Sequence, residues 1–166
     1  MPGCLAPGHT PSRLREEAIR ALHGTVSAMG GKLRLERITI DPDPYEPFRL
    51  VLGYRLGALL FISGQAAIDE HGQVVGAGDF DAQAEQVFHN LKRVLEAGGS
   101  SLANVVKVTI FLTDMSNFEK IVELRGKWFT PPYPADTIVE VSSLALPKLE
   151  IEIEAIAVAD ESVERV

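Results

Sequence analysis

The chain has 166 residues, of which 46% are hydrophobic and 23% are charged, and its formal net charge is -7. A length of this order predicts one domain of roughly 100–200 residues, with a tail, and the near-average composition excludes global disorder. The single cysteine, Cys4, excludes an internal disulfide framework or a cysteine-rich zinc site and favours a reducing compartment. The acidic balance argues against broad electrostatic binding of nucleic acid, which requires a basic surface.

The distribution of apolar residues argues against a membrane protein. The longest apolar stretch, around residues 58–62, falls far short of the roughly 20 residues that a spanning helix needs. Charged residues interrupt residues 1–28, where a secretory signal would need an unbroken apolar core, and the acids among them disfavour a transit peptide. We therefore expect no membrane association and a cytoplasmic location.

Residues 1–32 differ in composition and patterning from the rest and are expected to form an N-terminal extension. Prolines and glycines make its beginning irregular, and Leu14, Ala18 and Leu22 then fall on one face of a short helix. Three interpretations stay open. We favour a flexible or loosely docked extension over a helix that packs on a neighbouring subunit, and translation could instead begin at Met29.

Residues 33–159 have the pattern of one compact domain, and residues 160–166 form a short charged tail. In the first half, strands are expected over 35–40, 50–54, 59–62 and 73–75, with a proline-rich loop over 41–47 and a turn over 69–72. A helix follows, which Asp79 or Asp81 can cap and which Gly98 ends.

The second half repeats the alternation of strand and helix. A strand is expected over 105–112, and a helix is expected to begin at Asn117 and to stop before Pro131. Two more strands are expected over 137–141 and 151–158. Helices that are separated in this way by strands are expected to lie on one face of a mixed sheet, which is an α+β architecture.

No metal or nucleotide motif is visible. The four histidines lack ligand spacing to one another or to the cysteine, and the glycines follow neither a phosphate-loop nor a dinucleotide-binding pattern. We therefore expect neither a metal nor a cofactor.

Two features have chemical potential. The segment Ser63-Gly64-Gln65 ends an apolar strand, where free backbone amides can bind a ligand oxygen, although an ordinary strand end is an equal alternative. Glu152 and Glu154 share one face of the last strand because side chains alternate. On a covered face such a carboxylate would have a raised pKa and could act as a general acid or base. The alternative is a solvated or ion-paired strand, and Glu140 has the same ambiguity.

Several blocks in this order resemble the RidA (YjgF) superfamily of reactive-intermediate deaminases, over residues 35–158. They are residues 62–65, 90–98, 105–112, 134–141 and 151–158. The resemblance implies a chorismate-mutase-like α+β fold with two helices on one face of a mixed sheet. It also implies a homotrimer whose sheets pack into a barrel-like core, with ligand pockets in the clefts between subunits.

The resemblance further implies hydrolysis of enamines and imines derived from amino acids, which releases ammonia and a 2-keto acid without a cofactor. In this family an arginine grips the substrate carboxylate, and a glutamate on the last strand positions or activates water. The glutamate corresponds to Glu152, and the strand-end segment corresponds to Ser63, Gly64 and Gln65.

The chain departs from the family at the arginine. The family's Pro-Ala-Arg-Ser/Thr stretch reads Pro-Ala-Asp-Thr here, so that Asp136 takes the arginine position and Thr137 follows it. The Gly-Pro-Tyr segment is also missing at residues 46–50. A substrate carboxylate would meet Asp136 as a like charge. Three alternatives stay open: Asp136 selects an amine-bearing ligand, Arg125 supplies the positive charge, or the two residues form a structural ion pair or lie apart.

The leading hypothesis is therefore a RidA-like small-molecule hydrolase or deaminase with altered specificity. Glu152 would activate water, Ser63, Gly64 and Thr137 would hold the ligand, and Asp136 would help to select it. A non-catalytic trimer that binds a metabolite or a partner in the same cleft is the alternative, which the missing arginine favours. Ribonuclease activity, a label that the superfamily has carried, is disfavoured by the acidic balance.

Overall fold

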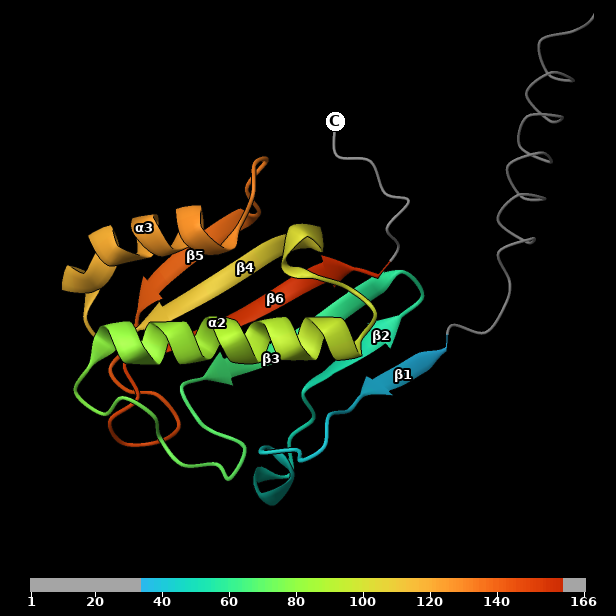
Figure 1. Cartoon of the computed structure of the whole chain (residues 1–166), viewed down its shortest axis with the longest axis horizontal. Coiled ribbons are helices and arrows are strands. Elements are labelled where there is room, and N and C mark those ends of the chain that lie inside the picture. Colours follow the sequence, from blue (N-terminus) through green and yellow to red (C-terminus); the bar gives the residue numbers. More distant parts are fainter. Residues whose placement is uncertain (1–33, 160–166) are drawn as a thin grey trace, which may run out of the picture. The chain divides into compact units, whose positions relative to one another are not determined.

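A six-stranded mixed sheet organises the computed structural model, which describes residues 34–159 (Figure 1). The expectations for residues 1–32 and 160–166 lie outside the described residues. The strands are β1 (Leu35–Ile38), β2 (Gly53–Leu56), β3 (Leu59–Ala66), β4 (Val105–Leu112), β5 (Ala135–Glu140) and β6 (Ile151–Val158). The α-helices are α2 (Phe80–Ala97) and α3 (Phe118–Trp128), and short 3-10 turns are η1 (Glu46–Phe48), η2 (Leu102–Asn104) and η3 (Met115–Asn117).

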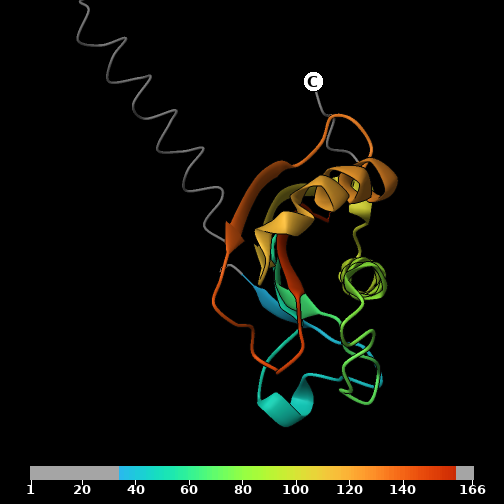
Figure 2. The ribbon, with the colours of Figure 1, turned by 90° about the vertical axis from the view of Figure 1, so that its left-hand side faces the viewer.

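The strands follow the order β1-β2-β3-β6-β4-β5. All neighbours pair antiparallel except β4 and β5, which pair parallel and are connected through α3. Both helices lie on the same side of the sheet (Figure 2). The expected α+β architecture, a mixed sheet with two helices on one face, is therefore confirmed.

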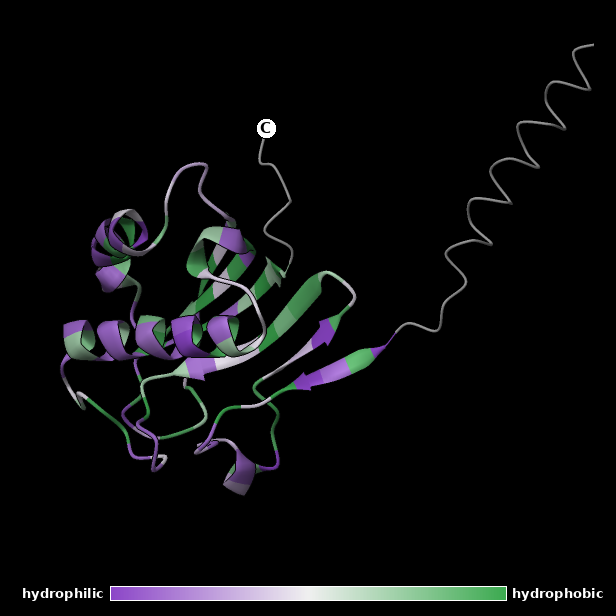
Figure 3. Ribbon diagram, turned by 45° about the vertical axis from the view of Figure 1, so that its right-hand side comes forward, coloured by the Kyte–Doolittle hydropathy of each residue, from purple (hydrophilic) through white to green (hydrophobic). Residues whose placement is uncertain are grey.

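The core lies between the helices and the sheet. Along β6 the residues Ile151, Ile153, Ala155 and Ala157 are buried, whereas the intervening residues are not. On β4 the residues Val108, Ile110 and Leu112 are buried in the same way, and they belong to the same core as Val87, Phe88 and Leu91 of α2. Figure 3 shows the result, in which hydrophobic strands lie behind a helix that carries hydrophilic residues along its outer face.

Local chemistry sets the two ends of α2. The side chain of Asp79 accepts a hydrogen bond from the Ala82 amide at 3.1 Å, so Asp79, rather than Asp81, caps the helix. Gly98 ends it, and a methyl group on Gly98 would lie 2.3 Å from Cδ2 of Leu60. A larger residue there would displace the side chains of Leu60 and Ile38, because the end of the helix packs directly on the sheet.

The strands expected over 35–40, 59–62 and 137–141 are observed with bounds shifted by a few residues, and two further expected strands differ for a physical reason. β2 begins at Gly53 rather than residue 50, because its ladder with β3 starts at the Gly53–Ile62 pair. The strand expected over 73–75 is reduced to a single bridge between Ile68 and Val74. There the Asp69 carboxylate accepts hydrogen bonds from the amides of His71 and Gln73, which replaces ladder bonds with an Asx-type turn.

No helix within residues 34–159 is both long enough and apolar enough to cross a bilayer.

A buried amide ties α2 to the end of β3. Asn90 is 8% exposed, and its Nδ2 donates to the carbonyls of Ala66 at 3.0 Å and Ile68 at 2.8 Å. Its Oδ1 accepts from Gln86 Nε2 at 2.9 Å. The side chain of Asn90 therefore positions the segment in which the sheet gives way to the loop after β3.

Replacing Asn90 should destabilise the fold. Asn90→Ala leaves two carbonyls in the interior short of a donor, so we expect the free energy of unfolding to fall by about 1–3 kcal/mol. Urea denaturation measures this loss. The control is His89→Ala on the exposed face of the same helix turn, where surface substitutions typically change stability by less than about 0.5 kcal/mol. Equal losses in the two variants would contradict this role of Asn90.

Candidate functional site

Glu152 and Gly64 meet where β6 pairs with β3. Glu152 follows buried Ile151 and therefore points to the face of the sheet that carries no helices. A methyl group on Gly64 would lie 1.8 Å from Oε1 of Glu152. The carboxyl group thus occupies space that only a glycine leaves free, beside an irregularity of β3 between Ile62 and Gln65.

A tyrosine fixes the backbone on either side of this contact. The Tyr45 hydroxyl donates to the Gly64 carbonyl at 2.8 Å and accepts from the Ala66 amide at 3.0 Å. Tyr45 is 6% exposed. Tyr45 was not predicted as a site residue, because the family's Gly-Pro-Tyr segment was expected at residues 46–50, whereas the pair Pro44-Tyr45 lies directly before them.

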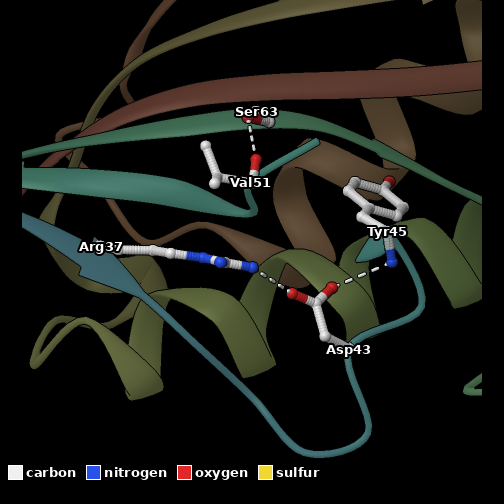
Figure 4. A network of polar contacts seen from close by, with 5 residues as sticks. All are labelled: Arg37, Asp43, Tyr45, Val51 and Ser63. Atoms are coloured by element: carbon white, nitrogen blue, oxygen red, sulfur yellow. Dashed lines mark hydrogen bonds and ion pairs between the residues drawn. The ribbon is translucent and has the colours of Figure 1, made fainter. Parts of the chain in front are cut away.

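Hydrogen bonds to the carboxylate of Asp43 stabilise the loop that carries Tyr45. Asp43 accepts from the Tyr45 amide at 2.9 Å through Oδ1 and from Arg37 Nη2 at 3.1 Å through Oδ2 (Figure 4). Figure 4 also shows Ser63, whose hydroxyl donates to the Val51 carbonyl at 2.7 Å. The bond between Arg37 and Asp43 connects the loop to β1. The bond between Ser63 and Val51 connects β3 to the residues before β2.

Glu152 lies in a small, largely apolar pocket of about 90 Å³. The pocket is lined by Tyr45, Phe48, Leu50, Gly64, Ala66, Ile68, Ala145, Leu146, Leu149 and Glu152. Among the described residues that line it, Glu152 has the one carboxyl group. A carboxylate in such surroundings loses hydration that the apolar walls do not replace.

The pocket alters the protonation of both ionisable groups that line it. Burial raises the pKa of Glu152 above its ordinary value, and the negative charge of Glu154 raises it further. Burial also raises the pKa of Tyr45 to about 12, so the phenol keeps its proton and its hydrogen bond to Gly64 at neutral pH. A carboxyl group in a pocket whose pKa is raised in this way is a candidate general acid or base.

Ser63 and Gln65, which flank Gly64 in the strand-end segment, form hydrogen bonds within the protein. Ser63 bonds to the Val51 carbonyl, and the Gln65 side chain is 2% exposed and donates to the Ser63 carbonyl at 2.9 Å. Of the three predicted residues, Gly64 is the one that lines the pocket of Glu152. The side chains of Ser63 and Gln65 stabilise the irregular backbone on both sides of Gly64.

The predicted residues on β5 lie elsewhere. Thr137 is on the helix-free face and accepts a hydrogen bond from Lys107 Nζ at 3.0 Å. Asp136 pairs in the ladder with buried Val108 and therefore faces the helices, where it accepts a hydrogen bond from Nε of Arg125 at 2.6 Å. Of the three alternatives for Asp136 and Arg125, the structure shows an ion pair between them. Within one chain, this pair and Glu152 lie on opposite faces of the sheet.

Within residues 34–159, no three histidine, cysteine, aspartate or glutamate side chains are grouped so that they could hold a metal ion.

Comparisons with known proteins bear on this site. Residues 41–159 match the family model described as Endoribonuclease L-PSP. RutC family protein PH0854 of Pyrococcus horikoshii is 43% identical over 116 residues, which are 70% of this chain and 90% of that protein. A protein of Dermatophagoides farinae named 2-iminobutanoate/2-iminopropanoate deaminase is 31% identical over 128 residues, 76% of this chain and 97% of that protein. The crystal structure of the Rid-family protein YyfA of Yersinia pestis has a TM-score of 0.70 at 29% identity, and the match covers 75% of this chain and 99% of that one.

The raised pKa of Glu152 predicts a pH dependence of stability. The folded protein binds the Glu152 proton more tightly than the unfolded chain does, so protonation of Glu152 stabilises the fold. This stabilisation is complete below pH 4.5, the ordinary pKa of the group, and is lost as the pH rises through the raised pKa. Glu152→Gln stays neutral at every pH. We expect its free energy of unfolding, relative to the unmodified protein, to increase from acid to neutral pH.

Urea denaturation at a series of pH values measures this difference. Glu119→Gln, which removes an exposed carboxylate at the start of α3, controls for the loss of one negative charge. A pH-independent difference for Glu152→Gln would contradict the raised pKa.

Proposed function

We propose that this chain, which belongs to the Endoribonuclease L-PSP family and so to the RidA (YjgF) superfamily, hydrolyses an imine or enamine-type metabolite. The observation that carries the proposal is the partly buried carboxyl group of Glu152, which has a raised pKa and lies against Gly64 in an apolar pocket. The name of the Dermatophagoides farinae relative, an iminobutanoate and iminopropanoate deaminase, supports the same chemistry. The reaction requires no cofactor.

Glu152 can serve both proton transfers of such a hydrolysis. Its protonated form donates to the imine nitrogen, which makes the carbon more electrophilic, and the resulting carboxylate then takes a proton from the attacking water. Glu152, which this proton has made neutral again, protonates the amine of the carbinolamine; ammonia then leaves as the carbon–nitrogen bond breaks, and the carboxylate takes the hydroxyl proton. One imine and one water thus give one carbonyl compound and one ammonia. The raised pKa makes Glu152 a better proton donor at a given pH than an ordinary glutamate, because more of it is protonated.

We further propose a homotrimer in a cytoplasmic setting, with the ligand cleft between subunits. The helix-free face of the sheet exposes Leu59 (42%), Phe61 (42%) and Val106 (46%). Apolar side chains gathered on one uncovered face are typical of a surface that another chain buries. The superfamily is typically oligomeric and binds small molecules, which supports this part of the proposal.

The substrate preference is proposed to differ from that of the amino-acid-derived imine deaminases, because Asp136 stands where the family has its carboxylate-binding arginine. The alternative function is a non-catalytic trimer that binds a metabolite or a partner in the same inter-subunit cleft. Loss of the arginine favours this alternative. The net charge of -7 speaks against the ribonuclease activity that the name of the family suggests.

Ammonia and carbonyl release from imines generated in situ tests the catalytic proposal. The imine panel should include substrates with and without a carboxylate. Glu152→Gln preserves shape and removes the acid–base group, so we expect turnover to fall by about 10²–10⁴-fold while ligand affinity changes little. Glu119→Gln, an exposed carboxylate on α3, should keep its activity. Unchanged turnover in Glu152→Gln would remove Glu152 from the mechanism, and ligand binding without turnover by the unmodified protein would support the binding function.

Light scattering after size-exclusion chromatography tests the trimer. Three chains of 18.1 kDa predict a mass of 54.3 kDa. Phe61→Asp puts a charge on the helix-free face and should shift the protein towards 18.1 kDa, because a buried unpaired charge is strongly unfavourable. His89→Asp, on the exposed face of α2, should leave the mass unchanged. A monomeric unmodified protein would contradict the proposed assembly.

A further inference from the structure

A buried glutamine connects α2 to two loops of the fold. Gln83 lies in the first turn of α2 and is 0% exposed. Its Nε2 donates to the carbonyls of Lys148 at 2.7 Å and Gly76 at 3.2 Å, and its Oε1 accepts from the amide of Glu150 at 2.8 Å. The loop between β3 and α2 (residues 67–79) and the loop between β5 and β6 (residues 141–150) therefore meet at this one side chain.

Both loops supply walls of the pocket that contains Glu152. The first loop supplies Ile68, and the second supplies Ala145, Leu146 and Leu149. Leu149 is 4% exposed, and its amide donates to the Leu146 carbonyl at 3.3 Å, so these two walls move together. Gln83 does not line the pocket. It can therefore influence the pocket through the backbone to which it bonds.

Gln83 bonds to the peptide groups on both sides of Leu149. One bond goes to the Lys148 carbonyl, and the other comes from the Glu150 amide. Lys148 has a φ of 71°, in the left-handed region that a residue other than glycine adopts at a cost in free energy. Such a conformation persists where the surrounding structure fixes it. The two bonds from Gln83 fix it from the interior of the fold.

Two further amide side chains lie on the same face of α2. Gln83, Gln86 and Asn90 have the spacing i, i+3 and i+7, which places them in one row along the helix. Gln86 Nε2 donates to the Ile68 carbonyl at 3.3 Å, and Asn90 donates to the same carbonyl at 2.8 Å. The row thus fixes the loop after β3 through Gln86 and Asn90 and the loop before β6 through Gln83.

We propose that Gln83 is a positioning residue for Glu152, because it fixes Leu149 and Leu146 and so keeps the pocket narrow. The catalytic part of this proposal rests on the proposed hydrolysis. The pocket volume of about 90 Å³ corresponds to roughly three water molecules at about 30 Å³ each. A small displacement of one wall therefore changes a large share of that volume. Misplacement of a bound substrate by about 1 Å can lower a rate by about 10²-fold.

NMR titration of the Glu152 side-chain carboxyl carbon tests the positioning without a substrate. Gln83→Met keeps the size of the side chain and removes its hydrogen bonds. We expect the pKa of Glu152 to fall towards 4.5, its ordinary value, because water enters the loosened pocket and hydrates the carboxylate. Glu154, whose charge also raises this pKa, is unchanged in the variant. The control Gln73→Met, at an exposed glutamine of the loop between β3 and α2, should leave the pKa as it is.

A second substitution separates positioning from stability. Glycine adopts a positive φ without the cost that lysine has, so Lys148→Gly combined with Gln83→Met should recover part of the pKa shift. Lys148→Gly alone should leave the shift intact. Gln83→Asn, whose amide is too short to reach both backbone groups, replaces Gln83→Met if that variant does not fold. The proposal is overturned if the folded Gln83 variant titrates at Glu152 like the unmodified protein, or if the double variant recovers none of the shift.

Chain-length selectivity tests the catalytic consequence. The probes are imines generated in situ from alanine and norleucine by an amino-acid oxidase, and from ethylamine and pentylamine by an amine oxidase. A fixed wall discriminates by length, so Gln83→Met should reduce the preference in kcat/KM for the short chain by about tenfold or more. A loss of folded protein alone would lower both rates equally. Gln73→Met should keep the preference.

The two measurements separate the two proposals. If no imine is turned over and Gln83→Met still lowers the pKa of Glu152, the hydrolysis fails and the positioning role of Gln83 stands. If turnover occurs while Gln83→Met changes neither the pKa nor the preference for chain length, the positioning role fails and the hydrolysis stands.

Discussion

The position of β6 between β3 and β4 is the constraint on which the rest of the structure depends. Its alternation sends Ile151 and Ile153 into the core under the helices and sends Glu152 to the other face. Each buried isoleucine contributes roughly 1.5–3 kcal/mol of hydrophobic free energy, so the register of β6 is strongly fixed. A shift by one residue would put the glutamates into the core. Core packing therefore also determines the position of the carboxyl group.

The segment next to that carboxyl group is held from both layers of the fold. From the helix layer, Asn90 donates to the carbonyls of Ala66 and Ile68. From the loop before β2, Tyr45 bonds to the Gly64 carbonyl and the Ala66 amide. An irregular stretch of strand would otherwise leave backbone groups unpaired. The two side chains satisfy those groups and make the irregularity a defined part of the pocket.

Regular periodicity made much of the fold predictable. The strands over 105–112 and 151–158 were predicted with the observed bounds, and Gly98 was identified as the end of α2. The strand over 73–75 was not, because a side chain of Asp69 competes for the backbone amides there. Glu152 and Gly64 followed from alternation and from the family resemblance. Tyr45 was missed because it lies in a proline-rich loop, where no period indicates which side chain turns inward. The pairing of Arg125 with Asp136 joins a helix to a strand across a connection, which spacing alone does not determine.

The placement of Glu152 and Asp136 on opposite faces of the sheet has a consequence for how such proteins diversify. Burial and Glu154 are what raise the pKa of Glu152, and neither depends on the residue at position 136. Within a chain, the sheet thus separates the Glu152 carboxyl group from changes of charge at position 136. A substitution of Asp136 can change the charge on the helix side of the sheet and leave the surroundings that raise the pKa of Glu152 as they are. The two faces of one small sheet can then vary in sequence independently.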